Sequence, residues 1–288
     1  MTQKFDKDKI RLIALDLDDT IIEHGIDISP ATLSAIGHMH NRGVTVAIAT
    51  GRLIKQIPPV LRNSPYISYL VASNGGVIFD NKSKKQLFQS VLEKEQVKEI
   101  IRIGNQTGAG IFISLEEISY CDIKTIVLTY RSIRVKYSRA QRKEASKLYK
   151  FKMLPPLGQN RFILNINKPI YKVSCLYKNE EIKKTKSVLY KDVEGVSAVS
   201  VSGNGLEITS DQATKGIAIS FLCREMGILK KNVLTFGDSG NDISMRDYSG
   251  TFVAMGNASP EVKEIADFIT GTVTEDGVAT FLLRNMHK

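Results

Sequence analysis

The first part of the chain alternates short apolar runs with amphipathic stretches. Residues 10–17 read IRLIALDL and residues 44–50 read VTVAIAT. Such nearly continuous apolar runs are typical of strands that are buried on both faces of a parallel sheet. Between them lies the stretch SPATLSAIGHMHNRG, in which Ser29 suits the N-cap of a helix, Pro30 its first turn and Gly43 its end. Strands joined by helices of this length predict βαβ units and a parallel sheet.

The last third of the chain repeats this pattern. Residues 213–228 (ATKGIAISFLCREMGI) predict a helix, and residues 232–238 (NVLTFGD) predict a buried strand. Residues 251–256 (TFVAMG) predict a further strand, and residues 259–269 predict a helix that runs into a short strand. The two ends of the chain together predict one α/β core with a doubly wound parallel sheet.

The middle of the chain has a different pattern. It mixes charged amphipathic stretches with β-like runs, namely a helix near residues 93–105, the runs TIVLTY (125–130) and YKVSCLY (171–177), and a helix near residues 179–191. This mixture predicts an α+β domain that is inserted between the two halves of the core. We expect the core to comprise residues 1–83 and 201–288, and the inserted domain residues 84–200.

The composition is that of a soluble globular protein, with 42% hydrophobic and 24% charged residues in 288. No apolar run approaches the roughly 18 residues that a membrane helix needs. The N-terminus has no apolar signal core, so we expect a cytoplasmic protein, a monomer or a homodimer, with no membrane partner. The three cysteines form no CxxC pair, which argues against a disulfide framework or a zinc site.

Positive charge is concentrated in the middle of the chain. Residues 82–194 contain 24 Lys and Arg against 11 Asp and Glu, whereas the rest of the chain contains 16 against 19. A basic domain can attract nucleic acid or a small anionic substrate, and a solvated lysine-rich surface is the plainer interpretation. The sequence has no zinc finger, no aromatic RNA-binding motif and no basic recognition helix, so we expect no nucleic-acid partner.

Polar residues follow three of the predicted strands of the core. In open α/β sheets ligands bind outside the carboxyl ends of the strands, so these residues should meet at one edge. They are Asp16, Asp18 and Asp19 after the first strand, Thr50, Gly51 and Arg52 after the second, and Asp238, Asn241 and Asp242 after the late strand. Turns that only cap the next helix would explain each cluster singly, but not all three together. Carboxylates packed together raise one another's pKa unless a cation lies between them, and Mg²⁺ fits because it accepts oxygen ligands.

Four motifs, in this order, resemble those of the haloacid dehalogenase-like phosphatases. DLDDT is similar to their first motif, DxDx[TV], ATGR to the second, ATKG to the third, and GDSGNDISM to the fourth. The phrases SNGG, LEIT and AMGNASPEVKEIAD resemble the Cof-type subgroup, subfamily IIB, and the insertion resembles the type C2 cap of that subgroup. The resemblance covers residues 10–82 and about 205–288. One departure is Asp19, where Cof-type proteins often have Gly.

The resemblance implies a Rossmann-like core and a Mg²⁺-dependent phosphatase that hydrolyses a small phosphorylated metabolite, such as a sugar phosphate, through an aspartyl-phosphate. It implies that Asp16 is the nucleophile and Asp18 the general acid and base. It further implies a phosphate site and a metal site. The phosphate site would comprise Thr50, Gly51, Lys215 and Asn241, with Thr50 and Lys215 also catalytic. The metal site would comprise Asp16, the backbone carbonyl of Asp18, Asp238, and Asp242, which holds a metal-bound water or orients Lys215. Asp19 would act only as a local backbone cap, with no part in the chemistry.

Three other functions stay open. A phosphotransferase or phosphomutase would use the same residues, with a sugar hydroxyl in place of water as the acceptor. A nucleic-acid-binding protein would use the basic insertion. An esterase with Ser239 as nucleophile would need a histidine base, and the only late histidine is His287, close to the chain end. The sequence does not name the substrate.

Overall fold

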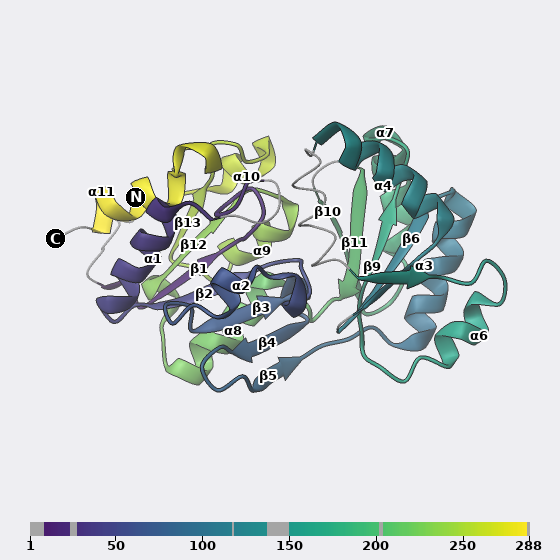
Figure 1. Ribbon diagram of the computed structural model, residues 1–288, viewed down its shortest axis with the longest axis horizontal. Coiled ribbons are helices and arrows are strands. Elements are labelled where there is room, and N and C mark those ends of the chain that lie inside the picture. The colour runs from purple at the N-terminus through teal and green to yellow at the C-terminus, as the bar shows by residue number, and fades with distance from the viewer. Residues whose placement is uncertain (1–8, 24–27, 117, 137–149, 202–203, 287–288) are drawn as a thin grey trace.

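The computed structural model of the protein describes residues 9–23, 28–116, 118–136, 150–201 and 204–286. These residues form two lobes that lie side by side, each built around one β-sheet (Figure 1). The larger lobe carries both ends of the chain, and the smaller lobe, called the cap below, is made from the middle of the chain. The structure confirms the predicted fold class, a doubly wound α/β core with an inserted α+β domain.

The described part of the larger lobe contains an eight-stranded sheet in the order β14-β13-β12-β1-β2-β3-β4-β5. The strands from β14 to β3 run parallel, whereas β4 and β5 are antiparallel to their neighbours. The strand order reverses beside β1, which is the kind of place where open α/β sheets bind ligands. The strands are β1 (Leu12–Leu15), β2 (Thr45–Ala49), β3 (Tyr69–Ala72), β4 (Val77–Asp80), β5 (Gln86–Gln89), β12 (Val233–Gly237), β13 (Thr251–Ala254) and β14 (Phe268–Ile269).

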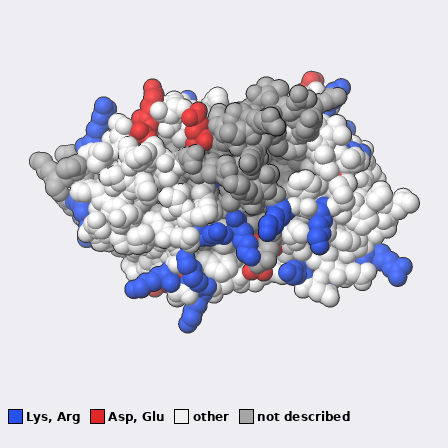
Figure 2. All heavy atoms as spheres, viewed as in Figure 1, with Lys and Arg blue, Asp and Glu red and all other residues white. Residues whose placement is uncertain are grey.

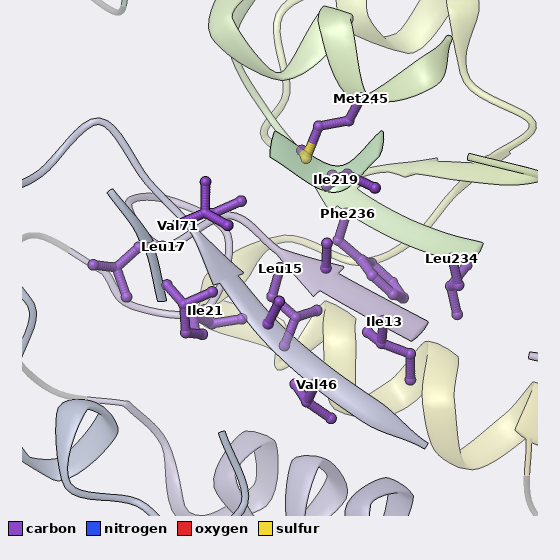
Figure 3. Close-up of a cluster of buried hydrophobic side chains, with 14 of the residues drawn as sticks. Ile13, Leu15, Leu17, Ile21, Val46, Val71, Ile219, Leu234, Phe236 and Met245 are labelled. Atoms are coloured by element: carbon purple, nitrogen blue, oxygen red, sulfur yellow. The ribbon is translucent and has the colours of Figure 1, made fainter. Parts of the chain in front are cut away.

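The central strands of this sheet are apolar because they are covered on both faces. All four residues of β1 are buried, and Leu15 pairs with Ile48 on β2 and with Phe236 on β12. Figure 3 shows Ile13, Leu15 and Phe236 in one cluster of buried side chains. A strand buried on both faces has no polar side to present, so its sequence does not alternate.

Two long helices of the larger lobe begin directly after a side chain that caps them. Ser29 Oγ accepts a hydrogen bond from Thr32 N at 3.0 Å and caps α1 (Pro30–Asn41), which packs on α11. Thr214 Oγ1 accepts from Ile217 N at 3.1 Å and caps α8 (Lys215–Met226), which therefore begins at Lys215. The other helices are α2 (Pro59–Arg62), α9 (Ile243–Arg246), α10 (Pro260–Ile265) and α11 (Gly277–Met286).

The cap contains a sheet in the order β10-β11-β9-β6-β7-β8, antiparallel except between β7 and β8. One face packs in the cap's own core through residues such as Ile111 and Ile113, and the other face presents Phe112 and Ser114 toward the larger lobe. The strands are β6 (Gly110–Leu115), β7 (Ser119–Cys121), β8 (Phe151–Met153), β9 (Ile170–Leu176), β10 (Val196–Ser200) and β11 (Gly205–Ser210). The helices are α3 (Lys94–Thr107), α4 (Ile123–Lys136), α6 (Gln159–Leu164) and α7 (Glu180–Ser187).

Two local expectations are wrong. The run TIVLTY, expected to be β-like, lies inside α4. Asp122 Oδ1 accepts a hydrogen bond from Thr125 N at 2.7 Å, which supports a helix start there and outweighs the β propensity of the run. The stretch GRLIKQIPPVLRNS (residues 51–64), whose sequence also predicts the start of a helix, is α-helical only over α2, because Pro58 and Pro59 cannot continue a helix from the residues before them.

Sheet membership suggests shifted boundaries for the inserted domain. β5 was expected in the insertion but pairs with β4 in the larger sheet, and β11 was expected in the core but pairs with β9 in the cap sheet. We therefore propose that the inserted domain runs from Ser90 to Ser210 rather than over residues 84–200. Only residues 211–214 then separate the last cap strand from α8 of the core.

The surface of the described residues bears on the expected partners. No helix among the described residues is both long and apolar enough to cross a membrane. On the face shown in Figure 2, the described Lys and Arg side chains are spread over both lobes. The described residues of this face therefore form no single basic stripe of the kind that follows a nucleic-acid backbone.

Candidate active site

The carboxyl ends of β1, β2 and β12 lie together because these strands are neighbours in the parallel sheet. Asp16, Thr50 and Asp238 follow them directly. At this edge, between the lobes, lies a cavity of about 320 Å³. The core lines it with Asp16, Asp18, Asp19, Gly51, Arg52, Gln56, Asp238, Ser239 and Asn241, and the cap with Phe112, Ser114, Lys172, Ser174, Val201 and Glu207.

A buried lysine joins two carboxylates at this edge. Lys215 Nζ donates hydrogen bonds to Asp16 Oδ1 at 2.5 Å and to Asp242 Oδ1 at 2.7 Å. Lys215 and Asp242 have no exposed surface, and Asp16 is only 4% exposed. A cation in the first turn of a helix is disfavoured by the helix dipole, so the two carboxylates account for the position of Lys215.

The turn after β12 holds Asp242 in place. Asp242 Oδ2 accepts hydrogen bonds from the backbone N–H groups of Asp238 at 2.9 Å and Ser239 at 3.0 Å. Gly237 leaves room for this approach, since a Cβ atom there would lie 2.4 Å from Cβ of Asp242. Both oxygens of Asp242 are thus engaged, and the geometry fits a residue that orients Lys215.

Negative charge exceeds positive charge in this cluster. Burial and the nearby charge of Asp242 raise the pKa of Asp16 from 3.8 to about 7, although Lys215 opposes the shift. Burial, with the charges of Asp16 and Asp242, raises the pKa of Asp238 to about 9. Burial disfavours the charge on Lys215, but Asp16 and Asp242 outweigh this effect and raise the pKa of the lysine. A bound cation would relieve the excess negative charge.

Three carboxylates of the cluster are close enough to share one ion. Asp16, Asp238 and Asp242 each offer an oxygen, and these oxygens all lie within 4.8 Å of one another. Thr20 Oγ1 donates to Asp238 Oδ1 at 3.2 Å and helps to orient that carboxylate. Buried oxygen donors with excess negative charge are the environment that Mg²⁺ prefers, so the residues present fit the expected ion.

Asp18 lies at the side of the cavity and forms a two-point ion pair with Arg52. Arg52 Nε and Nη2 donate to the two carboxylate oxygens of Asp18 at 2.9 and 2.5 Å. Arg52 Nη1 donates to Gln56 O at 3.0 Å, and the arginine is 5% exposed, whereas the side chain of Asp18 is 51% exposed. The sequence singled out Arg52 without giving it a role, and the structure shows that it holds the carboxylate of Asp18.

Asp19 has a special backbone conformation. Its φ of 57° lies in the left-handed region, which glycine adopts most easily. Its N–H donates to Ile22 O at 2.9 Å, and its carbonyl accepts from Asn257 Nδ2 at 2.7 Å. The conformation suits the Gly that the resemblance implies at this position, and it fits a role in the local backbone.

The expected phosphate-binding residues lie at the same edge. Thr50 is buried, and its Oγ1 accepts a hydrogen bond from Arg52 N at 3.1 Å. Gly51 O accepts from Lys172 Nζ at 2.8 Å, and Asn241 Nδ2 donates to Asn74 Oδ1 at 3.0 Å. The structure therefore brings together all of the site residues that the sequence suggested.

Three further polar residues, Lys172, Glu207 and Asn74, are linked to one another beside the site and had no expected role. Lys172 and Glu207 form an ion pair on the cap, and Asn74 Nδ2 donates to Glu207 Oε2 at 2.6 Å. Asn74 and Glu207 belong to the phrases SNGG and LEIT, which served only to support the resemblance. No sequence motif indicated a role for Lys172, because only the pairing of β9 with β6 and β11 in the cap sheet places it at the cavity.

The geometry gives no support to an esterase. Ser239 Oγ donates to Asn241 Oδ1 at 2.8 Å, and no described histidine forms a hydrogen bond with it. His287, the histidine considered as its base, lies outside the described residues. A serine nucleophile needs a histidine or comparable base within hydrogen-bond reach.

The chain is similar to curated phosphatases over most of its length. It is 25% identical over 280 residues to phosphatase YwpJ of Bacillus subtilis (strain 168), covering 94% of this chain and 98% of that protein. It is 27% identical over 273 residues to 5-amino-6-(5-phospho-D-ribitylamino)uracil phosphatase YcsE of the same organism, covering 94% and 93%. It is 25% identical over 277 residues to an HMP-PP phosphatase of Yersinia pseudotuberculosis (serotype I, strain IP32953), covering 94% of each chain.

Solved structures share the fold. A haloacid dehalogenase-like hydrolase from B. subtilis superposes with a TM-score of 0.82 at 24% identity, over 96% of this chain and 100% of that chain. The subclass IIB sugar phosphatase BT4131 superposes with a TM-score of 0.75 at 21% identity, over 95% and 98%. A family profile described as haloacid dehalogenase-like hydrolase matches residues 13–282. With this match and with the motif residues gathered at one sheet edge, the chain belongs to the haloacid dehalogenase-like hydrolases.

Proposed function

We propose that the protein is a Mg²⁺-dependent phosphatase that hydrolyses a small phosphorylated metabolite through an aspartyl-phosphate intermediate. The observation that carries the proposal is the buried contact of Lys215 with Asp16 and Asp242, at a sheet edge that opens into a cavity covered by the cap. The phosphatase names of the curated relatives support the same reaction.

Asp16 is the proposed nucleophile. One of its oxygens is bound to Lys215, so the other is the oxygen that would form the bond to phosphorus. A carboxylate is a weak nucleophile, and phosphoryl transfer depends mainly on positioning and on charge neutralisation. Lys215 offsets the charge of Asp16 and of the phosphate, and Thr50 and Asn241 would donate hydrogen bonds to phosphate oxygens.

Asp18 is the proposed general acid and base. As the phosphorus–oxygen bond to the leaving group breaks, Asp18 would give its proton to the leaving oxygen. The resulting carboxylate would then take a proton from the water that attacks the aspartyl-phosphate. Both oxygens of Asp18 accept hydrogen bonds from Arg52, which holds the group at the lining of the cavity as the carboxylate, the form that would take the proton from the attacking water.

The metal would be held by Asp16, Asp238 and the backbone carbonyl of Asp18, while Asp242 orients Lys215. When bound, the ion supplies positive charge that offsets the carboxylates and the phosphate. The raised pKa values of Asp16 and Asp238 support this part of the proposal, because they show how costly the cluster's charge is without a cation.

The substrate is proposed to be a small phosphomonoester. A cavity of about 320 Å³ has room for a leaving group of the size of a sugar and is lined largely by polar side chains from both lobes. The relatives' names point to small phosphorylated compounds, in one case a phosphoribitylamino-uracil and in another a sugar phosphate.

A phosphate-release screen over a panel of phosphorylated metabolites tests the proposal. We expect release with Mg²⁺, loss of release in chelator, and loss of release in Asp16→Asn. Release from no ester would refute the phosphatase, and full activity in chelator would refute the metal. Inorganic phosphate that appears in step with substrate loss excludes transfer to a sugar hydroxyl, which is the competing phosphotransferase.

Three expectations about the protein's surroundings are part of the proposal. We propose a cytoplasmic location, a monomeric or homodimeric state and no nucleic-acid partner. Cell fractionation and light scattering check the first two. Binding to DNA or RNA that falls steeply with salt would contradict the third.

A further inference from the structure

The cap presents a buried ion pair to the cavity. Lys172 on β9 and Glu207 on β11 form a salt bridge between Nζ and Oε1, and their side chains are 8% and 15% exposed. Ser174 of β9, which pairs with Glu207 in the cap sheet, also lines the cavity. The pair therefore lies on the cap wall that a leaving group would contact.

This ion pair continues into the core as a chain of hydrogen bonds. Lys172 Nζ donates to Gly51 O at 2.8 Å, and Glu207 Oε2 accepts from Asn74 Nδ2 at 2.6 Å. Asn74 Oδ1 in turn accepts from Asn241 Nδ2 at 3.0 Å. Two cap residues are thus connected to the loops that follow β2, β3 and β12.

Backbone geometry on the core side suits this contact. A Cβ atom on Gly51 would lie 2.9 Å from Asn74 Oδ1 and 3.1 Å from Glu207 Oε2, so glycine leaves the space that the cap carboxylate needs. Ser73 and Asn74 have φ angles of 53° and 59°, in the left-handed region, which Asn tolerates better than most residues and Ser seldom adopts. Strained backbone of this kind persists where its surroundings hold it and is concentrated at functional sites.

We propose that Lys172 and Glu207 are positioning residues for phosphoryl transfer. With the cap over the core, they hold the Gly51 and Asn74 loops, and through them Thr50 and Asn241, in the arrangement that binds the phosphate. The catalytic part of this inference rests on the proposed function, whereas the contact between cap and core does not.

The charge balance of the pair makes the inference testable. Removal of one partner leaves a buried charge without compensation, which destabilises a protein strongly, whereas removal of both leaves no such charge. The free energy of unfolding and the positioning of the phosphate-binding loops should therefore respond differently when one partner or both partners are removed. The double variant should regain stability but should still lack the link between the cap and the phosphate-binding loops.

The experiment compares Lys172→Met, Glu207→Met and the double variant with the wild type. We expect each single variant to lower the Tm and the double variant to recover much of that loss. We expect kcat to fall about 10²-fold in all three, because a small misplacement of reacting groups costs about that much. The conservative variant Lys172→Arg should retain more of kcat than Lys172→Met. The matched control is Glu99→Met with Arg102→Met, an exposed ion pair on α3 of the cap, which should change neither quantity.

A kcat that returns to the wild-type value together with the Tm of the double variant would show a merely structural pair and overturn the inference. Amide hydrogen exchange decides the same question without a substrate. Peptides that contain Gly51 and Asn74 should exchange faster in the double variant than in the wild type and in the control, and equal rates would refute the contact. If the wild type releases phosphate from no ester, the proposed function fails while this exchange test still stands.

Discussion

The two walls of the cavity, one from the core and one from the cap, differ in their balance of positive and negative side chains. On the core side Asp16, Asp238 and Asp242 lie close together, and one lysine, Lys215, pairs with two of them, Asp16 and Asp242. On the cap wall Lys172 pairs with one carboxylate. The core wall therefore carries an excess of negative charge that a bound cation would offset, whereas the charges of the cap wall cancel each other. The difference indicates that chemistry belongs to the core wall and that the cap wall positions and encloses.

The comparison of the two walls also shows how little of the positive charge of the inserted domain faces the cavity. Residues 82–194 carry a large excess of Lys and Arg, which the sequence suggested could attract a small anionic substrate. Among the described residues that line the catalytic cavity, however, Lys172 is the cap's only cation, and its partner is Glu207. Net charge along a segment does not show which side chains face a site, because most lysines keep their charged ends in solvent.

The largest fall in kcat is expected from a substitution on the core wall. Asp16→Asn removes the proposed nucleophile but keeps its size, so kcat should fall by at least about 10⁴-fold. Phosphate release with the best substrate of the panel measures this loss, and circular dichroism checks that the fold is kept. Asp192→Asn, at an exposed position of the cap, is the control and should leave kcat unchanged. Turnover that survives in Asp16→Asn would contradict the assignment of chemistry to this wall.

A smaller effect is expected from the residue that holds the general acid. Arg52→Met leaves Asp18 without its two-point partner, and kcat should fall about 10²-fold because the carboxyl group is no longer fixed. Arg52→Lys should restore little, since an ammonium cannot form the same paired contact. Arg246→Met, which breaks a partly exposed pair with Asp267, is the control. Equal effects in both arginine variants would show that Arg52 acts only on stability.

The charge excess on the core wall predicts how stability depends on pH. The folded-state pKa values of Asp16 and Asp238 are raised from 3.8 to about 7 and about 9, so their protonated forms are favoured in the folded chain. The stability that they contribute is present below pH 3.8 and is lost as the pH rises through these values. The Tm of the metal-free protein should therefore fall as the pH rises from about 5 to about 9.

Mg²⁺ should cancel this loss, because the ion takes the place of the protons. Thermal melts at several pH values, with Mg²⁺ and with chelator, give the comparison. Lys172→Met with Glu207→Met serves as the control, since the balanced cap wall should not alter the pH slope. A metal-free Tm that rises over the same range would show that the carboxylates carry no excess charge.

The smallest effect is expected at Asp19. Asp19→Gly places the residue that best tolerates a φ of 57° at this position, and the contacts that hold the turn use backbone atoms. We expect kcat to stay within about twofold and the Tm to stay equal or rise slightly. Steady-state kinetics and a thermal melt measure both. A large loss of activity would give the third carboxylate of DLDDT a part in the chemistry.

Local patterns were enough to predict much of the fold and of the candidate site. The apolar runs before Asp16 and Asp238 predicted buried parallel strands, because a strand covered on both faces must be apolar throughout. The topology of such sheets then placed their end residues at one edge. The run TIVLTY shows the limit of this approach, since the hydrogen bond from Thr125 N to Asp122 Oδ1 outweighed its β propensity.

The sequence by itself determined the α/β core, the strand-end residues and their likeness to a family, because each depends on short stretches of chain. Only the tertiary structure decided which wall of the cavity each charge faces. Lys172 and Glu207 are 35 residues apart, and Glu207 and Asn74 are 133 apart. Their contacts exist only after β9 has paired with β11 and the cap has met the core. The carboxylates of DLDDT can thus be identified from the sequence alone. The ion pair of Lys172 and Glu207 on the cap can be identified only from the folded structure.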